Sequence, residues 1–179
     1  MRVKAACCTA LLLLLASPAL AETVDINVMV VPAYQEVDIA LGYTTADIVA
    51  DIPLDTPVAG WGIDLELTGT SVSVDSVAIG ADWVGAPAPD GDGLAGLAFP
   101  DPVAGQGIVL ATVTFSLDDL GMTNLTLSDD YPVDLSEGFA LFPAGYADNV
   151  IYCGGCIDVV PEPATIGLLI VGAFLLRRR

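Results

Sequence analysis

Apolar and polar residues alternate with a period of two along most of this chain. In residues 23–30, TVDINVMV, every second side chain is aliphatic, and similar alternation returns in 36–43, EVDIALGY, in 47–54, DIVADIPL, and in 61–67, WGIDLEL. Successive side chains of a strand point to opposite faces of a sheet, so this period is typical of strands with one buried and one solvated face. Helical periodicity is not convincing before the last twenty residues. The pattern therefore predicts an all-β protein.

Turn-forming segments separate these and further apolar runs. The further runs cover 72–74, 77–79, 94–99, 109–117, 125–127, 139–142 and 157–160. Gly, Pro and Asp cluster between the runs, as in DTPVAG, APAPDGDG, PDPVAGQG and SDDYP. Many short strands with turn signals between them favour a single antiparallel β-sandwich. Residues 22–160 show no internal repeat and no long linker, so we expect one domain there with a substantial core.

The first 21 residues have the pattern of a secretory signal peptide. Arg2 and Lys4 precede an apolar run, and Ala19-Leu20-Ala21 supplies a small-x-small cleavage site. A retained membrane helix is the alternative, but the apolar stretch is short for a span. We therefore expect export and cleavage after Ala21.

The last 19 residues predict a membrane-directed tail. Pro161, Glu162 and Pro163 precede an apolar run at 164–176, and Arg177, Arg178 and Arg179 end the chain. As a helix this run would be about 20 Å long, short against roughly 30 Å of hydrocarbon. The arginines would stay on the cytoplasmic side and hold the body outside. A simple single-pass anchor is one interpretation of this tail.

The order Pro-Glu-Pro, apolar run and terminal arginines resembles the PEP-CTERM sorting signal. This resemblance implies recognition by an exosortase-type membrane enzyme and removal of the tail. It also implies export to the polysaccharide-rich surface or extracellular matrix of a Gram-negative-type bacterium, after transient or permanent anchoring in the inner membrane.

The body between the two ends contains no basic side chain. Two of the five Lys and Arg residues precede the cleavage site, three end the tail, and the chain has no His. All 23 acidic residues except Glu162 lie in 22–160, so the body carries 22 carboxylates and no cation. Nucleic acid is excluded as a partner of this body, because phosphate neutralisation needs basic groups. Cations, neutral sugars or a basic protein surface are compatible partners.

Three stretches of the body resemble a cohesin-type domain. They are VAGWGIDLELTGTSVSVDSVAIG at 58–80, DGLAGLAFPDPVAGQGIVLATVTFSL at 92–117 and TNLTLSD at 123–129. The resemblance covers about residues 37–160 and implies a jelly-roll sandwich of about nine strands, related to carbohydrate-binding modules, that binds without catalysis. Cohesins bind dockerin domains through contact residues that follow no transferable motif, so no contact residue is assigned. Residues 23–31 depart from the family as an additional strand.

Catalytic chemistry has few candidate groups in this body. Without His or Lys there is no Ser-His-Asp triad, no Cys-His pair and no amine nucleophile. Asp64 and Glu66 lie on the same face of one predicted strand, about 7 Å apart by strand rise. They face away from the apolar residues of that strand and toward water, so a raised pKa suited to glycoside hydrolysis is not expected. We expect a protein that is not an enzyme.

The segment Cys153-Gly154-Gly155-Cys156 has three interpretations. A redox pair would need a helix after the first cysteine, but the residues that follow read as a strand. A zinc site would need two further ligands of the right type. A structural disulfide that closes a Gly-Gly turn in an oxidising compartment is the interpretation we favour.

The ligand of the sandwich stays open between two classes. One is a secreted protein partner, either dockerin-like or basic. The other is a surface polysaccharide, for which Trp83 and Tyr131 are the candidates for stacking on sugar rings. The alternative for both aromatics is that they fill the ends of the sandwich.

Acidic turns are candidate cation sites. In PDGDGLAGLAFPD, Asp90 and Asp92 could form half of a calcium site, although the segment lacks the glycine and the flanking helices of an EF-hand. Asp129 and Asp130 form a second acidic turn. The alternative for each cluster is a hairpin turn with solvated carboxylates.

The uncompensated charge generates a prediction about stability. Repulsion among 22 carboxylates, counted as the 23 acidic residues less Glu162, opposes the compact state at neutral pH, and cations relieve it by screening or by binding. We expect the melting temperature to rise with sodium chloride and to rise further with millimolar calcium. The Asp90→Asn/Asp92→Asn variant tests whether this turn carries the calcium response. Equal melting at low and high salt, with no effect of a chelator, would contradict the prediction.

Overall fold

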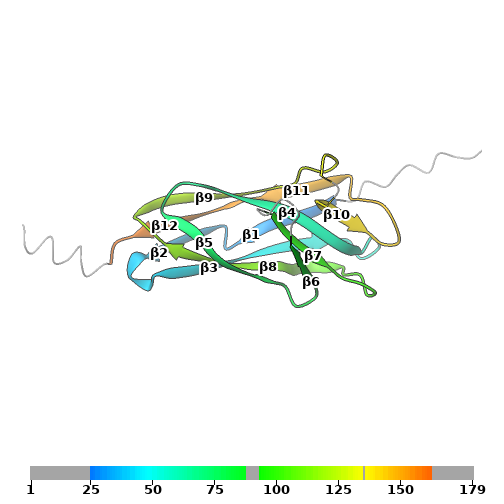
Figure 1. Ribbon diagram of the computed structural model, residues 1–179, viewed down its shortest axis with the longest axis horizontal. Coiled ribbons are helices and arrows are strands. Elements are labelled where there is room, and N and C mark those ends of the chain that lie inside the picture. Colours follow the sequence, from blue (N-terminus) through cyan, green and yellow to red (C-terminus); the bar gives the residue numbers. More distant parts are fainter. Residues whose placement is uncertain (1–24, 88–92, 135, 163–179) are drawn as a thin grey trace, which may run out of the picture.

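Two β-sheets pack face to face in the computed structural model, which describes residues 25–87, 93–134 and 136–162 (Figure 1). The strands are β1 (Asp25–Val31), β2 (Tyr34–Asp38), β3 (Tyr43–Ile52), β4 (Val58–Thr68), β5 (Val72–Ile79), β6 (Val84–Pro87), β7 (Gly93–Leu97), β8 (Gly105–Leu117), β9 (Gly121–Ser128), β10 (Gly138–Leu141), β11 (Asn149–Cys153) and β12 (Gly155–Val160). A short 3₁₀ helix, η1 (Ile39–Leu41), joins β2 to β3. The predicted all-β sandwich is confirmed.

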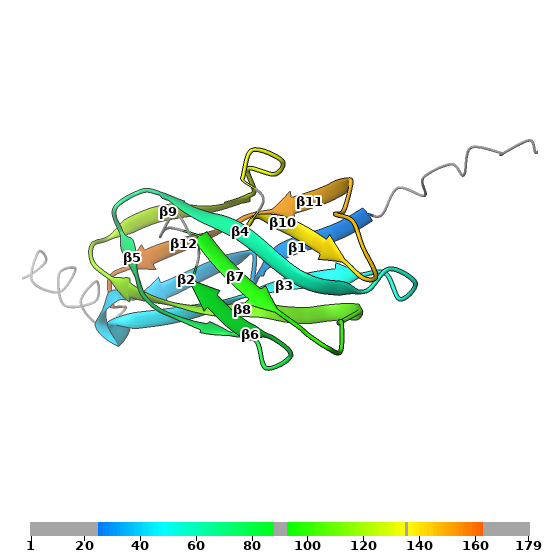
Figure 2. The same ribbon diagram turned by 45° about the vertical axis from the view of Figure 1, so that its right-hand side comes forward.

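The two sheets differ in size and in strand order. Sheet A has five strands in the order β11-β1-β3-β8-β5. Sheet B has seven, with β2-β12-β9-β4-β7-β6 in order and β10 paired to β4. Neighbouring strands are antiparallel except for the pairs β1 with β11 and β2 with β12, which are parallel. β4, its neighbour β7 and the edge strand β6 lie at the front in Figure 2.

The described chain forms twelve strands instead of the nine implied by the resemblance to cohesins. One reason is that the first and last segments of the sandwich each change sheets. β1 belongs to sheet A and β2 to sheet B, and the chain likewise leaves sheet A after β11 to enter sheet B as β12. The amino-terminal strand expected at 23–31 is present as β1.

The core follows the alternation of the sequence. Ile26, Val28 and Val30 of β1 are buried and the residues between them are not. Phe115 of β8 and Phe139 of β10 are among the largest side chains that are fully buried. Burial of such side chains stabilises the fold by about 1.5–3 kcal/mol each.

A buried pair of hydroxyls joins the two sheets at one end of the described chain. Ser71 and Thr123 share a hydrogen bond of 2.7 Å between their hydroxyls, and the Ser71 N–H donates to the same Thr123 oxygen. Both residues are almost inaccessible to solvent. This pair joins the turn before β5 to β9 across the end of the sandwich.

Several predicted features lie outside the described residues. They are the signal peptide at 1–21 with its cleavage residue Ala21, the candidate calcium ligands Asp90 and Asp92, and the tail residues Pro163, Arg177, Arg178 and Arg179. Pro161 and Glu162 follow β12 directly. In the described part of the chain, no helix is long and apolar enough to cross a membrane.

Candidate functional site

The outer surface of sheet B carries an exposed apolar face over β6 and β7. We call Val84, Leu97 and Phe99 the apolar face; their exposed fractions are 72%, 55% and 81%. Val84 of β6 is directly opposite Leu97 of β7, and Phe99 follows two residues later. Soluble proteins seldom expose large apolar side chains in a group. Where they do, the exposed apolar surface commonly marks an interaction site.

Two glycines of β4 allow other segments to pack closely on the outer surface of sheet B next to this face. Trp61 and Ile63 point into the core, so Gly60 and Gly62 lie where outward side chains would project. A Cβ at Gly60 would come within 2.8 Å of the Leu97 Cδ2 atom, and one at Gly62 within 2.3 Å of the Ser136 carbonyl oxygen. The glycines therefore let Leu97 and the loop before β10 lie flat against the sheet.

A second glycine contact supports the face from inside. A Cβ at Gly96 would lie 2.7 Å from Trp61 Nε1, so β7 can pack against the indole only with glycine at this position. Trp61 in turn meets Trp83 edge to face, with ring centroids 6.1 Å apart and planes at 88°. The two indoles therefore pack together on the core side of β7.

Carboxylates gather at the end of β9, on the other side of β4 from β7. The Tyr152 hydroxyl donates to Asp129, and the buried Glu137 accepts a hydrogen bond from the Asp130 N–H. Burial, followed by the hydrogen bond to Asp129 and the charges of Asp129, Glu137 and Asp64, raises the pKa of Tyr152 well above its usual range.

The predicted glycan-stacking role of Trp83 is wrong. Trp83 is only 6% exposed, and its Nε1–H donates to the Val109 carbonyl oxygen at 3.1 Å. The residue follows β5 in a turn, but its ring reaches back into the core. Tyr131 is exposed and stacks on Tyr146, with centroids 4.4 Å apart, so one of its faces is already covered.

The predicted Cys153–Cys156 disulfide is not present in the structure, where both residues are free thiols. The segment is no turn: the chain runs extended from β11 of sheet A into β12 of sheet B. Residues three apart in an extended chain are about 10 Å apart at Cα, beyond the roughly 7 Å that a disulfide spans. Where the chain passes between the sheets, Gly154 lies close to β9: a Cβ at this position would be 2.2 Å from the Leu125 carbonyl oxygen. Only glycine allows this close approach.

Asp64 and Glu66, the two carboxylates of β4, differ in exposure to solvent. Glu66 is exposed, as expected, whereas Asp64 is half-buried opposite Ser128 and Gly93. Within residues 25–87, 93–134 and 136–162, no group of three or more Asp, Glu or Cys side chains is placed to hold a metal ion.

The comparisons with known proteins concern the fold. No protein-family model matches the chain, and no curated protein is significantly similar to it in sequence. Solved cohesin modules, however, share its architecture, and the chain has a cohesin-like β-sandwich fold.

Three of these structures illustrate the likeness. The third cohesin of ScaC from Acetivibrio cellulolyticus, solved with a ScaB dockerin, is 16% identical, with a TM-score of 0.53 over 75% of this chain and 99% of that one. A non-cellulosomal cohesin from the archaeon Archaeoglobus fulgidus is 14% identical, with a TM-score of 0.52 over 80% and 96%. The cohesin module of a family 33 glycoside hydrolase from Clostridium perfringens is 10% identical, with a TM-score of 0.55 over 79% and 100%.

The raised pKa of Tyr152 generates a prediction about alkaline stability. Above pH about 10 the phenol ionises in the unfolded chain and stays neutral in the folded one, so its contribution to stability is present below that pH and is lost as pH rises. We expect wild type to lose up to about 1 kcal/mol per pH unit above pH 10 relative to Tyr152→Phe, after allowance for solvent screening. Urea unfolding at pH 9 and 11 measures this.

The exposed Tyr43 supplies the control, since Tyr43→Phe removes a phenol whose side chain is 65% accessible to solvent. Parallel pH dependence in Tyr152→Phe and wild type would contradict the prediction.

Proposed function

We propose that this chain is a non-catalytic interaction module of an exported protein, and that the apolar face binds a secreted protein partner. The observation that carries the proposal is the exposure of Val84, Leu97 and Phe99 at neighbouring positions on and after β6 and β7. Large apolar side chains in the middle of a contact surface supply most of the binding energy of typical interfaces.

The kind of partner follows from charge and from the similar structures. The described residues contain no Lys, Arg or His, so a partner with basic side chains around an apolar centre would be attracted and oriented. Several cohesins of similar fold were solved with dockerins, among them complexes from Clostridium thermocellum. A dockerin-like domain is therefore the partner class that we propose.

The proposal includes the route by which the protein reaches its partner. An exosortase-type membrane enzyme would recognise Pro161, Glu162, Pro163 and the terminal arginines, and the body would pass to the cell surface or the extracellular matrix of a Gram-negative-type bacterium. Support for this route comes from the sequence of the tail alone. Association with exopolysaccharide is the second binding function, and the exposed Tyr131 is the aromatic that favours it.

The sorting proposal predicts the size and place of the mature protein. Replacing Pro161, Glu162 and Pro163 by alanine should leave the protein in the inner membrane with its tail attached, because the processing enzyme would lack its recognition residues. Cell fractionation and intact mass of the exported protein measure this. A variant released and shortened like wild type would argue against exosortase processing.

The binding proposal predicts a loss of affinity on changing the apolar face. Leu97→Ser/Phe99→Ser should weaken a co-secreted dockerin-like partner by tenfold or more, because truncating a buried anchor typically costs about 2 kcal/mol. Leu41→Ser is a matched control, since it removes an equally exposed apolar side chain from η1. Calorimetry with the purified partner gives the dissociation constants.

Two outcomes would overturn this assignment. One is equal weakening by the Leu41→Ser control. The other is binding of a polysaccharide on a glycan array that persists in Leu97→Ser/Phe99→Ser and is lost in Tyr131→Ala, which would assign the second function.

A further inference from the structure

Exposed apolar side chains lie at the end of the sandwich where β12 finishes. β12 ends at Val160 beside η1, whereas β1 begins at the opposite end of the sandwich (Figure 1 and Figure 2). Leu41 of η1, Tyr43 at the start of β3 and Leu120 before β9 are 63%, 65% and 49% exposed. We call these three residues the end cluster.

The strand register places the end cluster around the last residues of β12. On one side, Val160 is directly opposite Asp38, the residue that precedes η1. On the other side, Val159 is directly opposite Gly121, the residue that follows Leu120. Because β12 lies between β2 and β9 in sheet B, η1 and the turn before β9 flank the point where the chain leaves the sandwich.

Local hydrogen bonds order the two turns that carry the leucines. The Asp38 side chain caps η1 by accepting from the Ala40 N–H at 2.9 Å. Gly42 ends η1 in the left-handed conformation, with a φ of 74°. In the turn before β9, Asp119 accepts from the Leu120 N–H at 2.8 Å. Both leucines therefore extend into solvent from turns with a defined backbone.

The sequence after β12 limits how far this end can lie from a membrane that holds the tail. Val160 is only four residues before Ala164, where the apolar run begins, and four residues of extended chain cover at most about 14 Å. The polar layer on each side of a bilayer is about 5–7 Å thick. As a helix the run would be about 20 Å long, so it is short for the hydrocarbon and its insertion would draw the body inward. With the tail inserted, the end of β12 lies at the headgroups.

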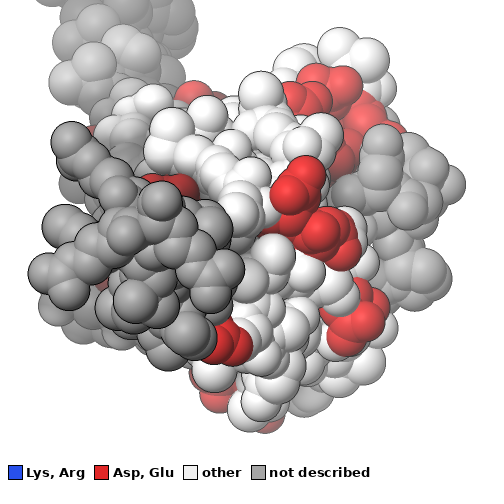
Figure 3. Space-filling model, turned by 90° about the vertical axis from the view of Figure 1, so that its left-hand side faces the viewer, with Lys and Arg blue, Asp and Glu red and all other residues white. Residues whose placement is uncertain are grey.

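The side chains at this end select the kind of lipid. Leucine gains free energy by entering the boundary between headgroups and acyl chains, and tyrosine is enriched at membrane interfaces because its ring is apolar and its hydroxyl polar. Asp118, Asp119 and Glu162 are exposed at the same end, and Figure 3, which faces it, shows carboxylates beside uncharged surface. Carboxylates are repelled by anionic lipids. Zwitterionic headgroups are therefore the lipid chemistry that fits.

We propose that this end of the sandwich seats the anchored protein on a zwitterionic lipid surface, with Leu41 and Leu120 in the interface and Tyr43 at the headgroups. The inference rests on the membrane-directed tail of the proposed function and adds the part of the body that contacts lipid. β12 then points toward the bilayer, so the long axis of the sandwich stands on the membrane (Figure 1). The outer surfaces of both sheets stay open to solvent, and the apolar face can meet a partner while the tail is still attached.

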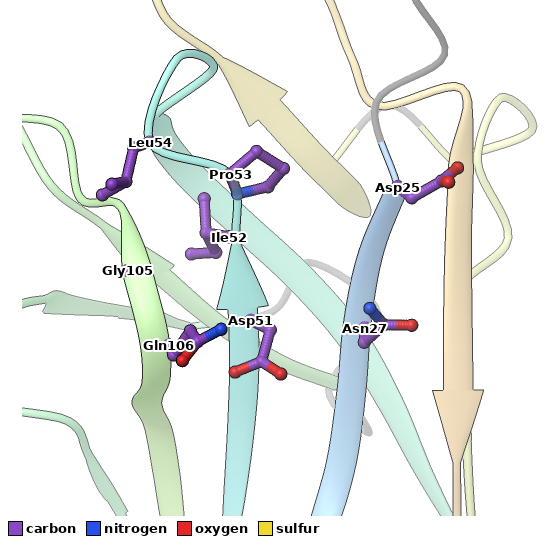
Figure 4. Close-up of a pocket in the computed structure, with 8 residues that line it drawn as sticks. All are labelled: Asp25, Asn27, Asp51, Ile52, Pro53, Leu54, Gly105 and Gln106. Carbon is purple, nitrogen blue, oxygen red and sulfur yellow. The ribbon is translucent and has the colours of Figure 1, made fainter.

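Methyl NMR of the full exported chain, residues 22–179, in phosphatidylcholine nanodiscs tests this. Lipids that carry a nitroxide near the headgroup broaden methyl signals at the membrane surface. We expect broadening of Leu41 and Leu120 but not of Leu54, which is 82% exposed in the loop after β3, at the opposite end (Figure 4). Phosphatidylglycerol in the disc should reduce the broadening at low salt, because it repels the acidic end, and added salt should restore it.

Variants measure what the two leucines contribute. Leu41→Ser/Leu120→Ser should lower the partition coefficient of the full chain into phosphatidylcholine vesicles about tenfold, because the accessible parts of the two side chains together equal about one whole leucine. Leu54→Ser is the matched control and should partition like wild type. Flotation over a series of lipid concentrations gives the coefficients, and thermal melting confirms that each variant is folded.

The outcomes separate this inference from the tail on which it rests. Broadening of the leucines within 164–176 without that of Leu41 and Leu120 would overturn the inference and leave the tail inserted. No broadening of either set would overturn both. Changes at Leu41 and Leu120 that follow protein concentration and need no lipid would assign this end to a contact between copies. Equal partitioning of Leu41→Ser/Leu120→Ser and wild type would also contradict the inference.

Discussion

Carboxylates without any basic partner are the constraint on which this structure depends. Since no Lys, Arg or His lies among the described residues, each carboxylate must face water or accept hydrogen bonds from N–H and O–H groups. The structure shows the second solution repeatedly: Asp47 with the Thr112 hydroxyl, Asp51 with the Gly107 N–H, and Glu137 with the Asp130 N–H. Such bonds fix carboxylates without neutralising them, so the surface keeps its full negative field. Figure 3 shows one end of the molecule, where Asp and Glu, in red, are the charged residues seen among the described ones.

This constraint gives the two outer faces different chemistry. On sheet A, Asp25, Asp47 and Asp51 take outward positions and are held by neighbouring strands. On sheet B, two of the outward positions of β4 next to β7 are Gly60 and Gly62, and Leu97 lies over Gly60. The absence of side chains there removes the need for polar partners and leaves an apolar surface. Acidic groups of sheet B lie elsewhere, at Glu66 of β4, Glu36 of β2 and Asp158 of β12.

The sequence predicted the strands well because each strand carries its own evidence. Alternation in β1, β3 and β4 reports which face is buried, and that face is buried against the other sheet as expected. Contacts between distant segments leave no such local trace. The ring of Trp83 is buried, and its Nε1–H donates to Val109, 26 residues away. Cys153 and Cys156 are separated by a change of sheet. The sequence places Leu97 and Phe99 in one apolar run at 94–99. Neither its period nor its composition shows that these two side chains lie on the face of sheet B that points away from sheet A.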